Sequence, residues 1–246
     1  MNLKPAIKYQ LRDFVKGVGI FYLVIYLIIL FLYVLVAVQI NDSDSNISGL
    51  ETATFIFLFV AGLNSFKNTF KLFLQNGLSR KTLFVSFSIA ALAIAFFMDV
   101  VDSINHLLLQ VIMPSQSIFD QIYSVKYVSQ PSYVRFFDKF VWFLFLYVAM
   151  LFLGYFVTSL YYRMNKWQKL AISIGVPVFL FMILPLIDTV LTHGAIFTAI
   201  QNFLIFAMGF SSGGINPYIF VLTCIVSSVI FGGLSLLLGR RAMIKE

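Results

Sequence analysis

The chain has 246 residues, of which 61% are hydrophobic and only 11% are charged. Charged residues make up roughly 25% of an ordinary soluble domain, so this composition excludes a soluble domain and indicates an integral membrane protein. The single cysteine, Cys224, excludes an internal disulfide and a zinc site built from cysteines. A net charge of +7 would suggest nucleic-acid binding in a soluble protein, but here its meaning depends on where the cations lie along the chain.

Residues 1–18 form a basic segment ahead of the first long apolar run, and they lack the small-residue cleavage site of a signal peptide. Apolar residues and cations recur on two adjoining stripes at helical spacing: Leu3, Ile7, Leu11, Phe14 and Val18 on one, and Lys4, Lys8, Arg12 and Lys16 on the other. We predict an interfacial helix whose cations reach the lipid headgroups. A plain basic tail beside the first span is the alternative.

Six apolar runs are long enough, or nearly long enough, for the roughly 20 residues that a membrane-crossing helix needs. They are residues 19–38, 53–73, 83–98, 140–161, 170–186 and 218–238. The third run is short unless its helix continues past Asp99 to Ile112, beyond the membrane. Pro177 and Pro185 are expected to kink the fifth run. Small residues in the sixth run, Gly232 among them, allow close helix packing.

The cations are distributed unequally between the connections of these six spans. With the N-terminus inside, the inner side holds Lys4, Lys8, Arg12, Lys16, Lys67, Lys71, Arg80, Lys81, Arg163, Lys166, Lys169, Arg240, Arg241 and Lys245, and the outer side holds Lys126, Arg135 and Lys139. Because cations are retained on the cytoplasmic side, both termini are predicted to be cytoplasmic. All acidic residues except Asp13 and Glu246 are assigned to the outer side. The basic excess therefore reflects topology, and no nucleic-acid partner is needed to explain it.

Three connections are predicted on the outer side. Residues 39–52 form a short polar loop, and residues 99–139 are long enough for a small cap of short helices. Residues 189–217 contain an apolar middle, 195–210, that is too short to cross the membrane. A segment of this kind between two spans is typical of a re-entrant or interfacial hairpin. We therefore predict an all-α membrane protein with an N-terminal interfacial helix, six transmembrane helices and an outer re-entrant hairpin before the sixth span.

The sequence contains no Gly-rich phosphate-binding loop, metalloprotease helix or nucleophile elbow. We assign no catalytic, cofactor-binding or metal-binding residue and expect no enzymatic activity of the chain's own. One constellation resembles a site: Asp99, Asp102 and His106 share a helix face and would be able to bind a cation or relay protons. The alternative is that they form the polar outer end of the third span, where ionisable residues cost little.

Residues 64–82, which we call the basic turn, separate the second and third spans. Phenylalanines at helical spacing lie beside cations in its first half, so the second span is expected to extend into an amphipathic cytoplasmic segment. Asn76 and Gly77 supply a left-handed C-terminal cap, and Ser79 caps the next helix. Cations at a helix start oppose the helix dipole, which indicates that topology or a partner requires them there.

The order of these parts resembles the membrane subunit of ABC transporters of the ABC-2, or type V exporter, class. That class combines a basic interfacial helix, six spans, a cytoplasmic turn between the second and third, and an apolar re-entrant hairpin before the sixth. The segment QNGLSRKTLF, residues 75–84, is similar to an N-G-x-S-R-K segment common in small permeases of Gram-positive bacteria. Such permeases include bacteriocin and lantibiotic immunity permeases and exporters of phenol-soluble modulins.

This resemblance implies a membrane-spanning subunit of an exporter in the bacterial cell membrane, with an amphipathic peptide, antimicrobial or lipid-like cargo. It implies that the basic turn contains a coupling helix seated in a groove of a separate ABC ATPase. ATP and Mg²⁺ would belong to that ATPase, and two permeases and two ATPases would form the working unit. The coupling residues that the resemblance indicates are Phe66, Phe70, Lys71, Phe73, Asn76, Gly77, Ser79, Arg80 and Lys81.

Two functions of other kinds stay open from the sequence. The substrate-binding membrane subunit of a vitamin importer also has about six spans, and binding of a vitamin to the purified chain would favour that function. An intramembrane enzyme would use Asp99, Asp102 and His106. Activity that survives without any ATPase and is lost in Asp102→Asn would favour the enzyme.

Overall fold

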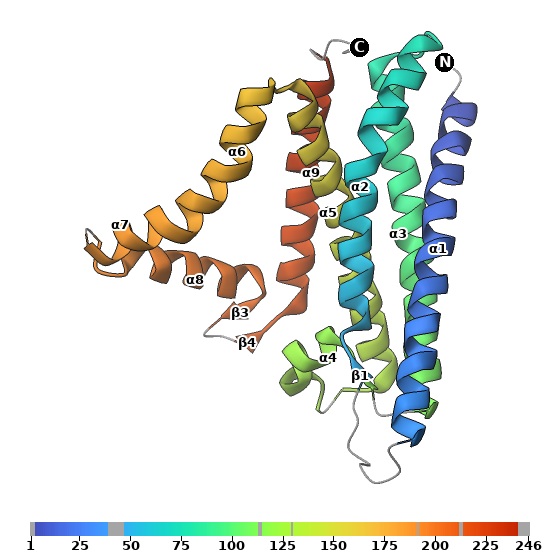
Figure 1. Cartoon of the computed structure of the whole chain (residues 1–246). Helices are drawn as coiled ribbons and strands as arrows, with labels where there is room; N and C mark the ends of the chain where they lie inside the picture. Colours follow the sequence, from blue (N-terminus) through green and yellow to red (C-terminus); the bar gives the residue numbers. More distant parts are fainter. Residues whose placement is uncertain are drawn as a thin grey trace.

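The first helix shows how the amino-terminal segment joins the membrane bundle. The computed structural model describes residues 3–38, 47–112, 115–128, 130–190, 192–211 and 214–240, nearly all of them helical (Figure 1). Helix α1 (Leu3–Val38) is continuous, so no break separates the predicted interfacial segment from the first span. Residues 1–2, residues 39–46 of the predicted polar loop and the cations Arg241 and Lys245 lie outside the described residues.

Four further long helices pack with α1 into a bundle: α2 (Leu50–Gln75), α3 (Arg80–Ile112), α5 (Ser132–Arg163) and α9 (Pro217–Arg240). Helix α5 packs against α2 and α9, and α1 packs mainly against α3. Helix α3 continues past Asp99, so it has the longer of the two lengths that the sequence allows for the third span. At 1.5 Å per residue it is roughly 50 Å long and exceeds the thickness of the hydrocarbon core.

Helices α2 and α5 cross in close contact at two glycines. A Cβ atom added to Gly62 would lie 2.4 Å from the carbonyl oxygen of Leu151, and one added to Gly154 would lie 2.2 Å from that of Phe59. Real Cβ atoms do not approach backbone oxygens this closely. Glycine at both positions therefore lets the two backbones touch.

Aromatic side chains fill the bundle beside this crossing. The rings of Phe66 on α2 and Tyr155 on α5 pack edge to face with centroids 5.2 Å apart, and Phe87 on α3 stacks on the same tyrosine at 3.9 Å. All three side chains are at most 2% exposed. Buried aromatic residues contribute large apolar areas and specific ring geometry, so this layer joins three helices.

A small cap closes one end of the bundle. Strand β1 (Ile47–Ser48) pairs in parallel with β2 (Ser115–Gln116), and helix α4 (Ile118–Tyr123) and the 3₁₀ turn η1 (Ser124–Tyr127) follow. Phe119 and Tyr123 on α4 are fully buried and contact Trp142 on α5. The predicted cap of short helices is confirmed, but it is smaller than residues 99–139 because α3 and α5 extend into that range.

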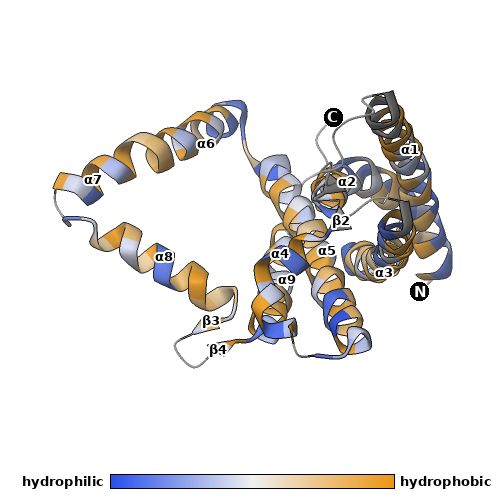
Figure 2. Cartoon of the chain, turned by 90° about the horizontal axis from the view of Figure 1, so that it is seen from below, coloured by the Kyte–Doolittle hydropathy of each residue, from blue (hydrophilic) through white to orange (hydrophobic). Residues whose placement is uncertain are grey.

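An arm of helices stands apart from the bundle, as Figures 1 and 2 show. It comprises α6 (Lys166–Val178), a π-helical segment η2 (Phe179–Ile183), α7 (Leu184–Val190) and α8 (Ala195–Ala207). The π-helical segment lies between Pro177 and Pro185, where the sequence predicts a kink. Prolines disturb the regular hydrogen bonding of a helix. The strands β3 (Phe210–Ser211) and β4 (Gly214–Ile215) form an antiparallel hairpin that leads into α9.

The turn between α7 and α8 is held by one carboxylate. Asp188 accepts hydrogen bonds from the backbone N–H groups of Ile196 at 2.8 Å and Phe197 at 3.3 Å. These groups belong to the first turn of α8, where backbone donors have no partner within the helix. Asp188 therefore caps α8 from the preceding helix, and Gly194, with a φ of 89°, permits the tight return.

Five segments among the described residues are long and apolar enough to cross a membrane: α1, α3, α5, the rod from α6 to α7, and α9. Helix α2 is not one of them, because its second half carries polar residues such as Asn64, Ser65 and Lys67. Helix α8 is apolar but only 13 residues long, too short to cross, as the sequence predicts. The chain is therefore an all-α, multi-pass membrane protein.

The two ends of the bundle differ in their connections. In Figure 1 the start of α1, the basic turn, the α5–α6 connection and the end of α9 lie at one end, which we call the basic end. The cap and the hairpin β3–β4 lie toward the opposite, cap end. The connections that carry most of the cations are thus gathered together in space.

Gly154→Ala is expected to destabilise the protein by about 1–3 kcal/mol, because a methyl group at the crossing forces α2 and α5 apart. Thermal unfolding of the purified protein in detergent measures this effect. Gly233→Ala is the matched control, because a Cβ atom there meets no neighbour. Equal unfolding temperatures for the two variants would contradict the close crossing.

Candidate functional site

The basic turn has the cap geometry that the sequence predicts. Gly77 has a φ of 70°, and the N–H of Leu78 donates to the carbonyl of Phe73 at 2.9 Å, which closes the end of α2. Ser79 Oγ accepts a hydrogen bond from the N–H of Thr82 at 3.2 Å and so caps the start of α3. The chain therefore stops one helix and starts the next within residues 76–79.

The three predicted phenylalanines of this turn lie inside the bundle. Phe66, Phe70 and Phe73 are 1%, 0% and 2% exposed. The ring of Phe70 packs against Tyr162 of α5, and that of Phe73 against Tyr9 of α1. The segment is amphipathic as predicted, but its apolar face is covered by the chain itself. These rings therefore support the turn and do not form its outer surface.

The polar residues of the predicted coupling set lie on the outside. Those that are exposed are Lys71, Asn76, Gly77, Ser79 and Lys81. Arg80 is half-buried, and its guanidinium donates to the backbone carbonyl of Arg240. That bond joins the start of α3 to the end of α9. The basic turn thus presents a polar, cationic surface on a firmly packed base.

At the cap end, Asp99, Asp102 and His106 all lie on α3, and each has different surroundings. Asp102 accepts hydrogen bonds from the hydroxyls of Tyr22 at 2.8 Å and Tyr147 at 2.6 Å. Asp99 is 1% exposed, and its Oδ2 has no hydrogen-bond partner among the described residues. Asp102 therefore links α1 to α5, whereas no hydrogen bond of this kind joins Asp99 to another described residue.

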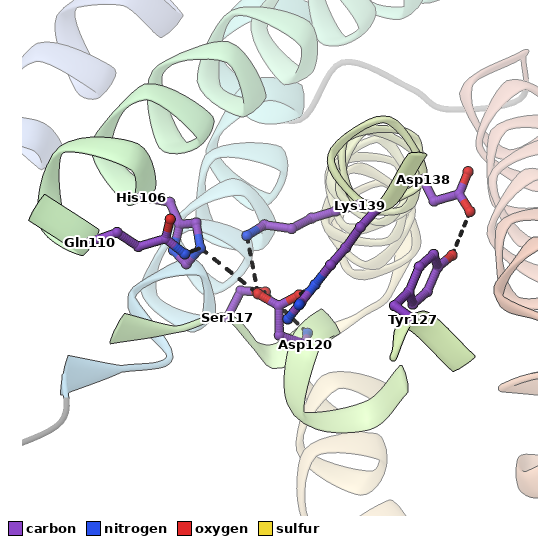
Figure 3. Close-up of polar contacts among 8 residues, drawn as sticks. His106, Gln110, Ser117, Asp120, Tyr127, Asp138 and Lys139 are labelled. Carbon is purple, nitrogen blue, oxygen red and sulfur yellow. Dashed lines mark hydrogen bonds and ion pairs between the residues drawn. The ribbon is translucent and has the colours of Figure 1, made fainter. Parts of the chain in front are cut away.

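His106 belongs to a different group, centred on Asp120 of the cap. His106 Nε2 lies 2.8 Å from Gln110 Nε2 and 3.8 Å from Asp120 Oδ2 (Figure 3). Asp120 also pairs with Arg135 at 2.7 Å and with Lys139 at 3.4 Å. Ser117 Oγ donates to Asp120 and accepts from its backbone N–H, so it caps α4.

The electrostatics of Asp120 follow from these contacts. Burial alone would raise the pKa of its carboxyl, but the Lys139 ammonium and the hydrogen bonds from Arg135 and Ser117 outweigh burial and hold the pKa below its ordinary value. Asp120 is therefore an ionised anchor for the cap. Sequence analysis missed it because its partners are 15 and 19 residues away and no spacing rule connects a loop helix to the next span.

A second carboxylate anchors the other side of the cap. Asp138 accepts hydrogen bonds from the hydroxyls of Tyr127 in η1 and Tyr218 at the start of α9, and Figure 3 shows the first of these. Tyr123 on α4 donates to the carbonyl of Met208 at 2.6 Å. These tyrosines tie the cap to the hairpin that leads into α9.

The cap-end groups line a small inner cavity and a larger, more open hollow of about 530 Å³, whose walls include His106, Asp120 and Lys139. A cavity of about 30 Å³, lined in part by Glu51, Asp102 and His106, has room for roughly one water molecule. Organic ligands generally occupy pockets of roughly 300–1,000 Å³. Among the described residues, no three His, Cys, Asp or Glu side chains lie close enough to hold a metal ion. The inner cavity is thus too small for a vitamin, whereas the volume of the open hollow falls within the range for organic ligands.

No family model matches the chain, and the searches of curated proteins and of solved structures give no significant match.

Asp102→Ala is expected to destabilise the protein by about 1–3 kcal/mol, because the buried hydroxyl of Tyr147 loses its acceptor. Asp99→Ala is the matched control one turn away: it removes a buried carboxylate with an unpaired oxygen, and we expect no loss of stability. Thermal unfolding in detergent measures both. Adding Tyr147→Phe to Asp102→Ala is expected to recover part of the loss, and an additive double variant would contradict the assigned hydrogen bond.

Acid is expected to weaken the anchor at Asp120. Its folded pKa lies below the ordinary value of 3.8, so its ion pairs stabilise the fold above that value, and this contribution is lost as the pH falls through the lower folded pKa. Unfolding temperatures measured between roughly pH 3 and pH 7 test this linkage. Asp120→Asn is expected to unfold earlier at neutral pH and to respond less to acid. Parallel curves for the two proteins would rule out Asp120 as the titrating anchor.

Proposed function

We propose that this chain is the membrane-spanning subunit of an ATP-driven ABC exporter, and that a separate subunit hydrolyses the ATP. The observation that supports this best is the geometry of the basic turn. Two bundle helices meet there in a doubly capped turn with exposed cations on a buried aromatic base. A protein that binds such a turn can push on α2 and α3 as stiff rods. In this proposal the exposed residues, Lys71 and Lys81 among them, contact the ATPase.

We also propose that α2 completes a set of six spans. In this proposal α7 and α8 form the re-entrant or interfacial hairpin that the resemblance to ABC-2 permeases implies. Helix α2 packs against α1, α3 and α5, each long and apolar enough to cross, which supports a position inside the membrane. The basic end then faces the cytoplasm of a bacterial cell, because cations are retained there. Closure of the partner ATPases would tilt α2 and the α6–α7 rod and move the pathway between inward-open and closed states.

The proposed working unit contains a second permease copy as well as two ATPases. The arm supports this pairing because α6 and the π-helical segment have no buried residue within the chain. Gln201 and Asn202 are exposed on the apolar helix α8. Polar side chains in an apolar environment need hydrogen-bond partners, which a second copy of the arm would provide.

An amphipathic peptide or lipid-like cargo fits the apolar surface of the bundle. A groove of about 470 Å³ runs between α3, α5 and α9, and its walls include Phe84, Phe145 and Phe152. Its two hydroxyls, of Ser88 and Ser228, already donate to carbonyls of their own helices. The groove therefore offers apolar contact with few polar groups, which suits the apolar face of such a cargo better than an ion or a sugar.

The test of this function is co-purification of the full chain with an ABC ATPase from its native membrane. Lys71→Glu with Lys81→Glu is expected to reduce the bound ATPase by roughly tenfold or more, because two exposed cations at the docking surface are reversed. Quantitative mass spectrometry of the purified complex measures the ratio.

The matched control for this test is Lys4→Glu with Lys8→Glu, which reverses two exposed cations of α1 and is expected to retain the ATPase. Phe70→Asp does not serve as a test, because Phe70 is fully buried and its replacement would unfold the chain. Absence of any ATPase from the wild-type preparation, or full retention in the Lys71 and Lys81 variant, would refute the proposal.

A further inference from the structure

Two adjoining hollows lie at the basic end, where α6 diverges from α5 and α9. Their volumes are about 490 Å³ and 600 Å³, and both are lined by Leu160, Arg163 and Leu238. We call them together the α5–α9 hollow. Figure 1 shows α6 leaving the bundle at this point. The hollow therefore lies where α5 and α9 end, on the side from which α6 diverges.

The lining of the hollow is apolar along its floor and cationic at one end. Its floor is apolar and includes Phe156, Leu160 and Leu234. Arg163 and Arg240, which also line it, are the last residues of α5 and α9. The cations thus lie at the end of the hollow nearest the aqueous phase, while the apolar side chains extend about two helical turns toward the membrane centre.

Among the described residues that line the hollow or form the first turn of α6, every charged side chain is a cation. Lys166 and Lys169 are exposed on the first turn of α6, and the sequence contains no Asp or Glu in residues 139–187 or 189–245. Helix C-termini carry partial negative charge, which favours the two arginines where they are. Trp167, 81% exposed, marks the headgroup level, where exposed tryptophans are enriched.

We propose that the α5–α9 hollow binds an anionic phospholipid, with the phosphate on Arg163 and Arg240 and an acyl chain along the leucine-lined floor. Guanidinium groups bind phosphate oxygens in bidentate geometry. An apolar floor alone would not select a lipid, because the surrounding bilayer is equally apolar. Selection therefore comes from the headgroup charge. A peptide cargo is less suited to this hollow, because the cations described at its mouth repel the basic residues of many amphipathic peptides.

This inference goes beyond the exporter proposal and does not need an ATPase. The test uses the full chain purified in detergent and titrated with phosphatidylglycerol or with phosphatidylcholine of the same acyl chains. Native mass spectrometry measures the bound lipid per chain. The wild type is expected to prefer phosphatidylglycerol by roughly tenfold or more, as two cations near the headgroup imply.

Arg163→Gln with Arg240→Gln is expected to abolish this preference. Lys67→Gln with Lys71→Gln removes the same charge from exposed positions at the same end, away from the hollow, and is expected to retain it. An equal preference for phosphatidylglycerol in the arginine variant and the lysine variant would overturn the proposed site.

A second variant separates a lipid site from a simple anion site. Leu160→Trp with Leu234→Trp fills the floor while keeping both arginines, and it is expected to lose bound phosphatidylglycerol. Inorganic phosphate in excess is expected not to displace the lipid. Displacement by phosphate, or unchanged lipid binding in the filled variant, would overturn the proposal. The amount of bound lipid does not depend on the ATPase interaction that the Lys71 and Lys81 variant tests. The lipid site and the exporter function can therefore be refuted separately.

Discussion

Backbone contact between α2 and α5 at Gly62 and Gly154 is the constraint on which the rest of the bundle depends. Because the two helices touch without side chains between them, the residues on either side are forced into register. On the side of the basic end, the aromatic layer around Tyr155 lies next to the crossing. One turn further along α5, Thr158 Oγ1 donates to the carbonyl of Leu63 at 2.6 Å. In a membrane, where hydrophobic burial adds little between helices, such close packing and hydrogen bonding supply the specificity. Helix α5 is thereby fixed at the centre, with α9 on its far side.

The polar groups at the cap end form a second, separate set of constraints. Asp102, Asp120 and Asp138 each bind groups from at least one other element, so the charges that would be costly near a membrane are satisfied within the protein. Asp102 joins α1 to α5, Asp120 joins the cap to α5, and Asp138 joins η1 to α9. The bundle is therefore held by close backbone contact between α2 and α5 and by hydrogen-bonded carboxylates at the cap end.

The sequence predicted those features that local chemistry determines, and it missed those that depend on helix crossing. The caps at Gly77 and Ser79 and the short length of α8 follow from residue types at near neighbours, and the structure confirms them. The sequence left two lengths open for α3, and the structure shows the longer one. The burial of Phe70 and Phe73 was not predicted, because helical spacing identifies an apolar face but not what covers it. Gly62 and Gly154 were missed for the same reason: each is an ordinary glycine in an apolar run until the partner helix is known. The network around Asp120 joins residues that only the three-dimensional cap brings together.

The length of α3 gives the molecule a mechanical property. This helix begins at the basic turn and runs without a break to the cap, where its outer turns carry Asp102 and His106. A stiff rod of roughly 50 Å that tilts by about 5° displaces one end by roughly 4 Å relative to the other, which is longer than a hydrogen bond. A rigid-body rotation of α3 by a few degrees about its basic end would therefore be large enough to separate a hydrogen-bonded pair at its cap end.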